Sequence, residues 1–350
     1  MQLTYDAVRQ AMERIRPPAD PNLEGLVCQR MSMLTKPAGS LGRLEDLALR
    51  VALMRGEMSP AIRRKRMVVF CGDHGVTAEG VSAYPSDVTR QMAANFVRGG
   101  AAISVLCRQY NIECVVVDAG IEGDPVPGVV PGKIAPGTRN FAREPAMTRE
   151  QAEASIALGF SQASDADLLG AGEMGIGNTT SAAALMAAFT GLDPAACAGR
   201  GTGVDDATLA HKVDVIRRAL DLHRPDPANA IGTLAALGGF EIGAIAGFIL
   251  GAAASRTPVV LDGFIACSAA LVVRALCPTA LDYVVYAHRS QEHGHAAMLT
   301  TLGADPLLDL GMRLGEGSGA ALGMQVVESA VRLYVEMATF RDAGVSEASA

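Results

Sequence analysis

Met67-Val68-Val69-Phe70-Cys71 is a continuous hydrophobic run that ends in Gly72-Asp73-His74-Gly75. A run of this length without polar alternation is typical of a strand that is buried on both faces of a parallel sheet. Further segments of the 350-residue chain repeat the pattern and end in a polar or glycine-rich turn: Cys114–Val117, Asp167–Leu169, Pro258–Leu261 and Tyr283–Tyr286.

Helical patterns separate these strands, and they cover Ser86–Tyr110, Thr148–Ser164, Asn178–Phe189, Asp205–Leu222 and Ile242–Ala254. Strands that alternate with helices indicate right-handed βαβ units. The sequence therefore predicts an α/β fold with a mainly parallel sheet flanked by helices, in a Rossmann-like arrangement. The loops after parallel strands meet in one crevice where ligands bind. The polar residues expected there are Asp73, Asp118, Glu173, Asp262 and Ser290.

Both ends of the chain fall outside this alternation. Helices are predicted at Tyr5–Arg16, Leu23–Leu34, Leu41–Met54 and Ala320–Met337. We expect residues 66–312 to form a large α/β domain with the substrate crevice, and residues 1–65 plus 313–343 to form a small helical domain. Residues 344–350 are expected to be a mobile tail.

The composition narrows the class of protein. A net charge of −7 disfavours nucleic acid or an acidic membrane as the main partner. The seven cysteines show no C-x-x-C and no regular spacing, which indicates reduced thiols and a cytoplasmic location. The most hydrophobic run, Ile242–Ala254, is shorter than the ~20 residues of a membrane span. We therefore expect no membrane span, and a buried helix notched by glycines at this position.

Arg313-Leu314-Gly315-Glu316-Gly317-Ser318-Gly319 places one carboxylate between glycines, just ahead of the predicted C-terminal helix. Glycines on both sides let the backbone adopt positive φ and approach a ligand closely. The unpaired N–H groups at a helix N-terminus also favour negative charge. The alternative is an ordinary exposed loop, and this stretch alone does not decide between the two.

Gly170–Gly175 matches the G-x-G-x-x-G pattern of a dinucleotide-binding loop and precedes a helix. Asp193 lies about as far along the chain (~20 residues) as a ribose-binding carboxylate does. Three points weaken this interpretation: the preceding strand is very short, Glu173 would face a pyrophosphate, and the βαβ unit is not the first in the chain. A NAD-dependent oxidoreductase that uses this loop is the alternative function.

The segment that follows is a candidate phosphate site. Hydroxyl and amide side chains at a helix start suit a monophosphate or ribose hydroxyls, which bind N–H groups and the positive end of the helix dipole. The residues expected to bind substrate there are Gly175, Gly177, Asn178, Thr179 and Thr180. Simple N-capping is the alternative.

Gly199-Arg200-Gly201-Thr202-Gly203 is a second glycine-rich turn before a helix, and Lys212 follows it. The backbone amides of Gly201 to Gly203 would form a nest for an anion. A plain flexible connection explains the same residues equally well.

Two smaller groups of residues remain. His288, His293 and His295 lie close together, but no cysteine accompanies them, so a polar loop or a substrate contact is favoured over a metal site. Ser82, Tyr84 and Gln91, with Met92 next to Gln91, would suit the wall of a pocket for a flat, largely apolar heterocycle. The same three residues are also typical of a loop that enters a helix.

Taken together, these motifs resemble the nicotinate-nucleotide–dimethylbenzimidazole phosphoribosyltransferase family, and the resemblance covers most of the chain. It rests on several stretches in the right order: Lys36–Gly42, Gly72–Val76, Asp118–Gly120, Gly172–Thr180, Gly199–Gly203, Leu261–Phe264 and Arg313–Gly317. The family implies a large α/β domain, a small helical domain built from both chain ends, and a homodimer.

The resemblance also implies an activity and roles for residues. Phosphoribosyl would pass from nicotinate mononucleotide to 5,6-dimethylbenzimidazole, with inversion at the anomeric carbon and without a cofactor or metal. Glu316 occupies the position of the family's general base, and Glu173 is its expected catalytic companion. Other expected substrate contacts are Lys212, Asp262, Gly263, Ser290, Arg313 and Leu314.

The chemistry is compatible with so few residue types. A carboxylate at Glu316 would remove the proton that the benzimidazole N–H loses, while Glu173 would bind ribose hydroxyls or stabilise oxocarbenium character. A second hypothesis is that Glu173 and Glu316 share the base role, because both are flanked by glycines.

Overall fold

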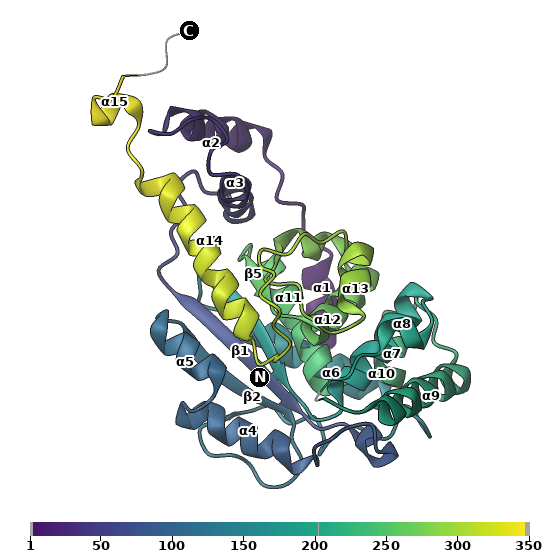
Figure 1. Cartoon of the computed structure of the whole chain (residues 1–350). Coiled ribbons are helices and arrows are strands. Elements are labelled where there is room, and N and C mark those ends of the chain that lie inside the picture. Colours follow the sequence, from purple (N-terminus) through teal and green to yellow (C-terminus); the bar gives the residue numbers. More distant parts are fainter. Residues whose placement is uncertain (1–2, 202, 347–350) are drawn as a thin grey trace.

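A parallel sheet forms the centre of the molecule in the computed structural model, which describes residues 3–201 and 203–346 (Figure 1). Its strands lie in the order β3-β2-β1-β4-β5-β6, and each neighbouring pair is parallel. The strands are β1 (Lys65–Gly72), β2 (Glu113–Gly120), β3 (Val130–Pro131), β4 (Leu168–Met174), β5 (Val259–Leu261) and β6 (Val284–Tyr286). The predicted α/β class and the Rossmann-like arrangement are therefore confirmed, since this strand order is the Rossmann order.

The strand order determines where the crevice lies. The chain builds outward from β1 to β3 and then returns to the other side of β1 with β4. Ligands of open α/β sheets bind at such a switch point, outside the carboxyl ends of the strands. Here those ends are the segments after Gly72 and at Met174, so Glu173 lies at the switch point itself.

Helices cover both faces of the sheet (Figure 1). On one face lie α6 (Arg149–Gln162), α7 (Asn178–Thr190), α10 (Ala230–Leu237), α11 (Phe240–Ala254) and α12 (Phe264–Leu276). On the other lie α4 (Asp87–Arg98), α5 (Ala102–Gln109) and α14 (Ser318–Glu336). The remaining helices are α1 (Tyr5–Met12), α2 (Pro21–Met33), α3 (Arg43–Arg55), α8 (Pro194–Cys197), α9 (Asp206–His223), α13 (His295–Leu302) and α15 (Phe340–Ala343).

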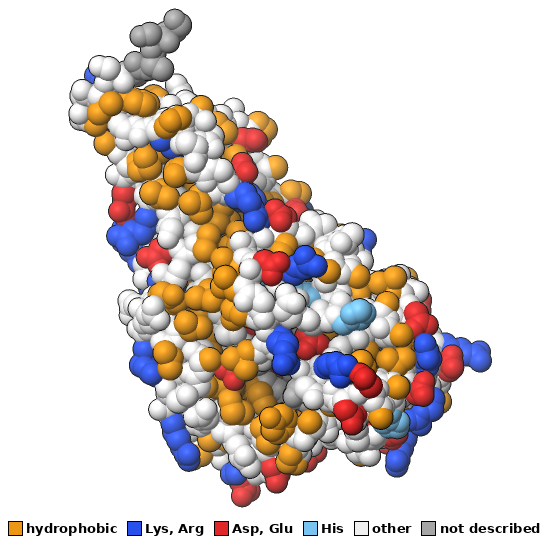
Figure 2. Space-filling model, viewed as in Figure 1, with side chains coloured by type: hydrophobic (Ala, Val, Ile, Leu, Met, Phe, Trp, Pro, Cys, Tyr) orange, Lys and Arg blue, Asp and Glu red, His pale blue; other side chains and the backbone are white. Residues whose placement is uncertain are grey.

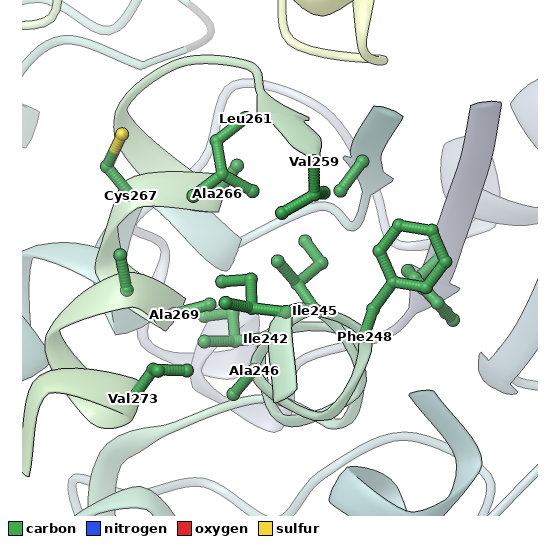
Figure 3. Packing of buried hydrophobic residues seen from close by; sticks show 14 of the residues in the cluster. Ile242, Ile245, Ala246, Phe248, Val259, Leu261, Ala266, Cys267, Ala269 and Val273 are labelled. Atoms are coloured by element: carbon green, nitrogen blue, oxygen red, sulfur yellow. The ribbon is translucent and has the colours of Figure 1, made fainter. Parts of the chain in front are cut away.

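Helix α11 is the centre of the core on its face. Figure 3 shows Ile242 and Ile245 of this helix between β5 and α12, while the ring of Phe248 packs edge-on against Phe70 of β1. The other side of α11 is notched by glycine, because a Cβ at Gly247 would overlap the carbonyl group of Ile156 in α6. The buried, glycine-notched helix predicted at Ile242–Ala254 is confirmed. No helix in the described part of the chain is long and apolar enough to cross a membrane.

One predicted helix was wrong in its extent. The segment predicted as a single helix, Ser86–Tyr110, is two helices, α4 and α5, which are separated at Gly99-Gly100. Gly99 adopts a left-handed φ of 83° and ends α4. A glycine in this conformation is a common helix terminus. The sequence patterns also did not predict β3, α8, α10, α12 and α13.

The loop predicted at Gly170–Gly175 was also wrong, because Gly170 to Met174 belong to strand β4. A Cβ at Gly170 would lie 2.6 Å from the Met67 methyl group, and one at Gly172 would lie 2.5 Å from the carbonyl of Glu316. These glycines are therefore required by close packing around the strand. They do not form a turn around a pyrophosphate, and Asp193 instead caps α8 and pairs with Arg217.

The two chain ends partly meet. Helices α2, α3 and α14 pack on one another, and Arg30 donates a 2.9 Å hydrogen bond to the carbonyl of Val335. Helix α1 packs instead against α6 and α11. We propose that residues 66–312 form the large domain and that residues 1–65 plus 313–343 form the small one. Helices α2, α3 and α14 make up the helical unit of the small domain, and α1 packs on the large domain. Of the predicted tail, residues 347–350 lie outside the described residues.

The contact between β4 and the Glu316 segment gives a stability prediction. Gly172→Ala inserts a methyl group against the Glu316 backbone, and overpacking of this kind costs about 1–3 kcal/mol. We expect a lower thermal unfolding midpoint by calorimetry. Gly25→Ala is the matched control: Gly25 is exposed in α2 with nothing within 4 Å of its Cβ, so its midpoint should stay or rise. Equal midpoints for the two variants would contradict the contact.

Candidate active site

A cavity of about 480 Å³ opens at the carboxyl ends of the strands. Figure 2 shows the face of the molecule on which hydrophobic and charged side chains surround a hollow. Many predicted site residues line the cavity: Glu316, Glu173, Gly175, Asn178, Thr179, Gly201, Asp262, Gly263, Ser290, Arg313, Leu314 and Tyr84. The prediction that strand-end loops and the Glu316 segment meet in one crevice is confirmed for these residues.

Glu316 lies in a strained turn at the cavity wall. Gly315, Glu316 and Gly317 have consecutive φ values of 84°, 66° and 90°, a region that residues other than glycine rarely adopt. Its side chain is only 6% exposed, and Oε2 has no hydrogen-bond partner among the described residues. The alternative of an ordinary exposed loop is therefore wrong. Strain of this kind is typical of functional sites.

The environment of Glu316 changes its proton affinity. Burial raises the pKa of the Glu316 carboxyl, and the nearby Asp262 carboxyl raises it further. The N–H of Ile103, in the first turn of α5, acts in the opposite direction. A raised pKa makes this carboxylate a stronger base than an exposed glutamate.

Asp262, at the end of β5, holds the turn in place. Its Oδ2 accepts a 3.0 Å hydrogen bond from Gly317 N–H, and its Oδ1 accepts a 3.0 Å hydrogen bond from Ala320 N–H. These N–H groups belong to the N-terminus of α14, whose N-cap residue Gly317 has no side chain to satisfy them. Both carboxylate oxygens of Asp262 thus bind the backbone next to Glu316. His288 Nε2 lies 3.6 Å from Oδ1.

Glu173 is buried at the end of β4. Burial raises its pKa to about 8, with further contributions from the charges of Asp262 and Glu241. Asn178 donates a hydrogen bond to Oε2. A Cβ at Gly315 would lie 2.5 Å from Oε1, so the carboxyl group lies directly against the Glu316 turn. At neutral pH this group therefore keeps its proton.

The N-terminus of α7 forms the opposite part of the cavity. Thr179 Oγ1 accepts a 2.9 Å hydrogen bond from Lys212 Nζ, which also donates to the Gly199 carbonyl at 3.2 Å. Burial lowers the pKa of Lys212 to about 8. A helix N-terminus with a lysine beside it is suited to an anion such as a phosphate. Arg313 Nη1 donates to the Gly201 carbonyl at 3.2 Å and brings a second cation to the cavity.

Several predicted residues do not line this cavity: Gly177, Thr180, Gly203, Lys212, Ser82 and Gln91. Gly177 is the N-cap of α7, and Thr180 is buried behind it. Gly203 lines a neighbouring cavity, and Thr202 lies outside the described residues. Lys212 contacts the start of α7 from behind, through Thr179.

The wall of the cavity that includes Tyr84 was predicted only in part. Tyr84, Val88 and Met92 line the cavity, whereas Gln91 is exposed on α4 and Ser82 accepts a hydrogen bond from Tyr84 N–H. Val88 and Met92 lie four residues apart on one side of α4, so the helical period would have identified Val88 together with Met92, whereas Tyr84 precedes the helix. The other unpredicted lining residues are Met174, Ile176, Phe264, Ile265 and Glu292, whereas His288, from the histidine cluster considered as a substrate contact, also lines the cavity.

The remaining polar strand ends have structural partners. Asp73 accepts from Glu122 N–H at 2.8 Å, and Asp118 accepts from Ile121 N–H at 2.8 Å. His295 Nδ1 accepts a 2.8 Å hydrogen bond from Ser290 N–H, and burial lowers the pKa of His295 to about 3. No group of three or more potential metal ligands occurs within residues 3–201 and 203–346.

The fold and the site define a class of protein. A Rossmann-ordered sheet, an anion site at a helix N-terminus and a buried carboxylate over the same cavity are features of an enzyme that acts on a phosphorylated nucleotide. A family model described as phosphoribosyltransferase matches residues 16–345.

Known proteins make the assignment specific. Proteins named nicotinate-nucleotide–dimethylbenzimidazole phosphoribosyltransferase from Chloroflexus aggregans and Geobacter sulfurreducens are each 51% identical over 337 residues, which is 94% of this chain and 96% of theirs. A crystal structure of CobT from Thermus thermophilus matches with a TM-score of 0.89 and 45% identity, over 94% of this chain and 100% of that one. The chain belongs to the nicotinate-nucleotide–dimethylbenzimidazole phosphoribosyltransferase family.

The proton on Glu173 gives a pH prediction. Because the folded-state pKa of about 8 exceeds the unfolded value, the neutral carboxyl favours folding fully below the unfolded pKa, and this advantage is lost as the pH rises through 8. Glutamine cannot ionise, so the Glu173→Gln variant does not lose this stability as the pH rises. We expect the melting temperature of the variant, relative to the unmodified protein, to increase between pH 6 and pH 9.

The contribution of Lys212, which titrates near the same pH, is present in both proteins and cancels in the comparison. Glu24→Gln, at an exposed position of α2, is the control and should leave the pH dependence of melting unchanged. Parallel melting curves for Glu173→Gln and the unmodified protein across this range would show that Glu173 is ionised at neutral pH.

Proposed function

We propose that this chain transfers phosphoribosyl from nicotinate mononucleotide to 5,6-dimethylbenzimidazole, giving α-ribazole 5′-phosphate and nicotinate. The observation that carries the proposal is the cavity itself, in which the Glu316 carboxylate and the anion site at the start of α7 face the same space. Family membership supports it, since the relatives carry the name of this activity.

The bond changes require one base and no acid. The bond between C1′ and the pyridinium nitrogen breaks, and its electron pair stays on that nitrogen, so nicotinate leaves neutral at the ring nitrogen. One benzimidazole nitrogen bonds to C1′ from the opposite face, which inverts the configuration. The other ring nitrogen then loses its proton to Glu316. General base catalysis of this kind contributes about 10²–10⁴-fold. No redox or metal step is needed, so no cofactor is proposed.

The geometry supports a place for each part of the substrates. The phosphate would bind the N–H groups at the start of α7, with Lys212 behind Thr179 and Arg313 nearby. The heterocycle would lie between Val88, Met92 and Phe264, because an apolar wall suits a flat ring. The 480 Å³ cavity lies within the usual size of small-molecule sites.

A protonated Glu173 favours one of its two expected roles. A neutral carboxyl donates a hydrogen bond to a ribose hydroxyl, whereas it stabilises oxocarbenium charge poorly. It also cannot accept a proton, so we assign the base role to Glu316 and substrate binding to Glu173.

Release of nicotinate tests the function directly. The purified protein is mixed with nicotinate mononucleotide and 5,6-dimethylbenzimidazole, and both products are followed by chromatography. We expect nicotinate to appear in a 1:1 ratio with α-ribazole 5′-phosphate. Binding of nicotinate mononucleotide without release of nicotinate would instead identify a non-catalytic nucleotide-binding protein.

Replacing the base gives a sharper prediction. In Glu316→Gln we expect kcat to fall by about 10²–10⁴-fold, because the amide cannot accept the proton, while the affinity for the benzimidazole is retained. Steady-state kinetics and a binding titration measure the two effects. Glu336→Gln, at the exposed end of α14, is the control and should leave kcat unchanged.

Full turnover of Glu316→Gln across the pH range would remove Glu316 as the base. The hypothesis of a shared base predicts a further loss when Glu173→Gln is added to Glu316→Gln. A double variant no slower than Glu316→Gln alone, at saturating substrate, would argue against sharing.

We also propose a cytoplasmic homodimer. Exposed hydrophobic side chains support it, and Figure 2 shows such side chains along the face over α14. Exposed large hydrophobic residues elsewhere on the surface include Leu26 and Met33 of α2, Val97 of α4 and Val105 of α5. Analytical ultracentrifugation should give twice the 36.2 kDa of one chain. A mass of one chain at all concentrations would contradict the dimer.

A further inference from the structure

A buried polar network lies beneath the cavity, and the proposed mechanism does not use it. His74, which follows β1, places Nε2 2.7 Å from Glu241 Oε1 and Nδ1 3.0 Å from Ser181 Oγ. Both side chains of the His74–Glu241 pair are fully buried, and Ser181 is buried as well. His74 does not line the cavity, so it does not contact the substrate.

The hydrogen bonds have defined directions. The Ser181 hydroxyl donates to the Gly238 carbonyl at 3.3 Å. It therefore accepts from Nδ1–H of His74, because a hydroxyl has only one proton to donate. One further proton lies between Nε2 and Glu241 Oε1. The network connects the end of β1 with the first turn of α7, through Ser181, and with the first turn of α11, through Glu241.

The imidazole ring is also enclosed by the turn that precedes α7. A Cβ at Gly175 would lie 3.3 Å from His74 Nε2, and one at Gly177 would lie 3.2 Å from His74 Cβ. On the other side, a Cβ at Gly239 would collide with Cε1 of the ring. The ring thus packs between the turns that begin α7 and α11, and a movement of the ring would displace the Gly175–Gly177 backbone.

We propose that His74, held by Glu241, is a positioning residue that orients the N-terminus of α7 for the phosphate of the nucleotide substrate. The identity of that ligand rests on the function proposed above. Ser181 is one turn from Asn178, so a hydrogen bond to Ser181 acts on the same helical turn whose N–H groups face the cavity. The His74–Glu241 pair would act through its position and not through an electrostatic attraction to the phosphate, because the backbone encloses both side chains and neither is directed at the cavity.

A selective loss of phosphate binding distinguishes positioning from general stability. Ser181→Ala removes the acceptor for Nδ1–H with little change in volume, and His74→Asn retains a donor at the Nδ1 position while it breaks the contact with Glu241. In both variants we expect the dissociation constants of nicotinate mononucleotide and of inorganic phosphate, measured by calorimetric titration, to rise about threefold to tenfold. The dissociation constant of 5,6-dimethylbenzimidazole should change by less than about twofold.

Ser155→Ala is the matched control, because Ser155 is equally buried but donates to Ala152 within its own helix α6. It should leave all three dissociation constants unchanged even if it lowers the melting temperature. Unchanged phosphate affinity in Ser181→Ala, or an equal loss for phosphate and benzimidazole, would overturn the proposal. Since inorganic phosphate binding requires no turnover, failure of the proposed reaction would be recognised separately, by the absence of nicotinate release in the unmodified protein.

Discussion

The hydrogen bonds from Gly317 and Ala320 to the Asp262 carboxylate are the interaction on which the site depends. The N-cap of α14 is Gly317, which has no side chain to accept hydrogen bonds from the first N–H groups of the helix. The Asp262 side chain, at the end of β5, accepts these hydrogen bonds instead. The same bonds hold Glu316 in a left-handed conformation against Gly172 of β4. The candidate base is therefore positioned by the sheet, although it lies far along the chain from the strand it touches.

Several buried carboxyl groups surround this interaction, and their different environments separate their roles. Asp262 binds backbone N–H groups, Glu241 pairs with His74, and Glu173 receives a hydrogen bond from Asn178. Glu316, in the cavity wall, has a buried oxygen, Oε2, without a partner among the described residues, and Glu241, away from the cavity, has another. Burial and the negative charges of its neighbours together raise the pKa of Glu173 to about 8, so its carboxyl group is neutral at neutral pH.

The strands were predictable because their pattern is local. Buried parallel strands are continuous hydrophobic runs, and β1, β2, β5 and β6 lie where such runs end in polar turns. The glycines of β4 were misassigned because a motif cannot distinguish a glycine that binds a phosphate from one that makes room for another segment. The segment that Gly172 accommodates is Glu316, and nothing near Gly172 in the sequence indicates it.

The site residues, too, were predictable only where a local sequence pattern marks them. Neighbouring glycines identified Glu173 and Glu316, and the polar start of a helix identified Asn178. The inward side of α4 required a helical period that Gln91 does not follow. The His74–Glu241 pair spans 167 residues, so no spacing rule connects its members. Pairing of this kind arises only when the switch point of the sheet brings the starts of α7 and α11 together.

The most direct test of the account is a crystal structure of the protein with α-ribazole 5′-phosphate bound. We expect a Glu316 carboxylate oxygen at about 3 Å from the free ring nitrogen of the benzimidazole, and the phosphate at the start of α7 near Thr179 and Lys212. A ring nitrogen directed at another group, or a phosphate bound away from α7, would contradict the central claim that one cavity joins this base to this anion site.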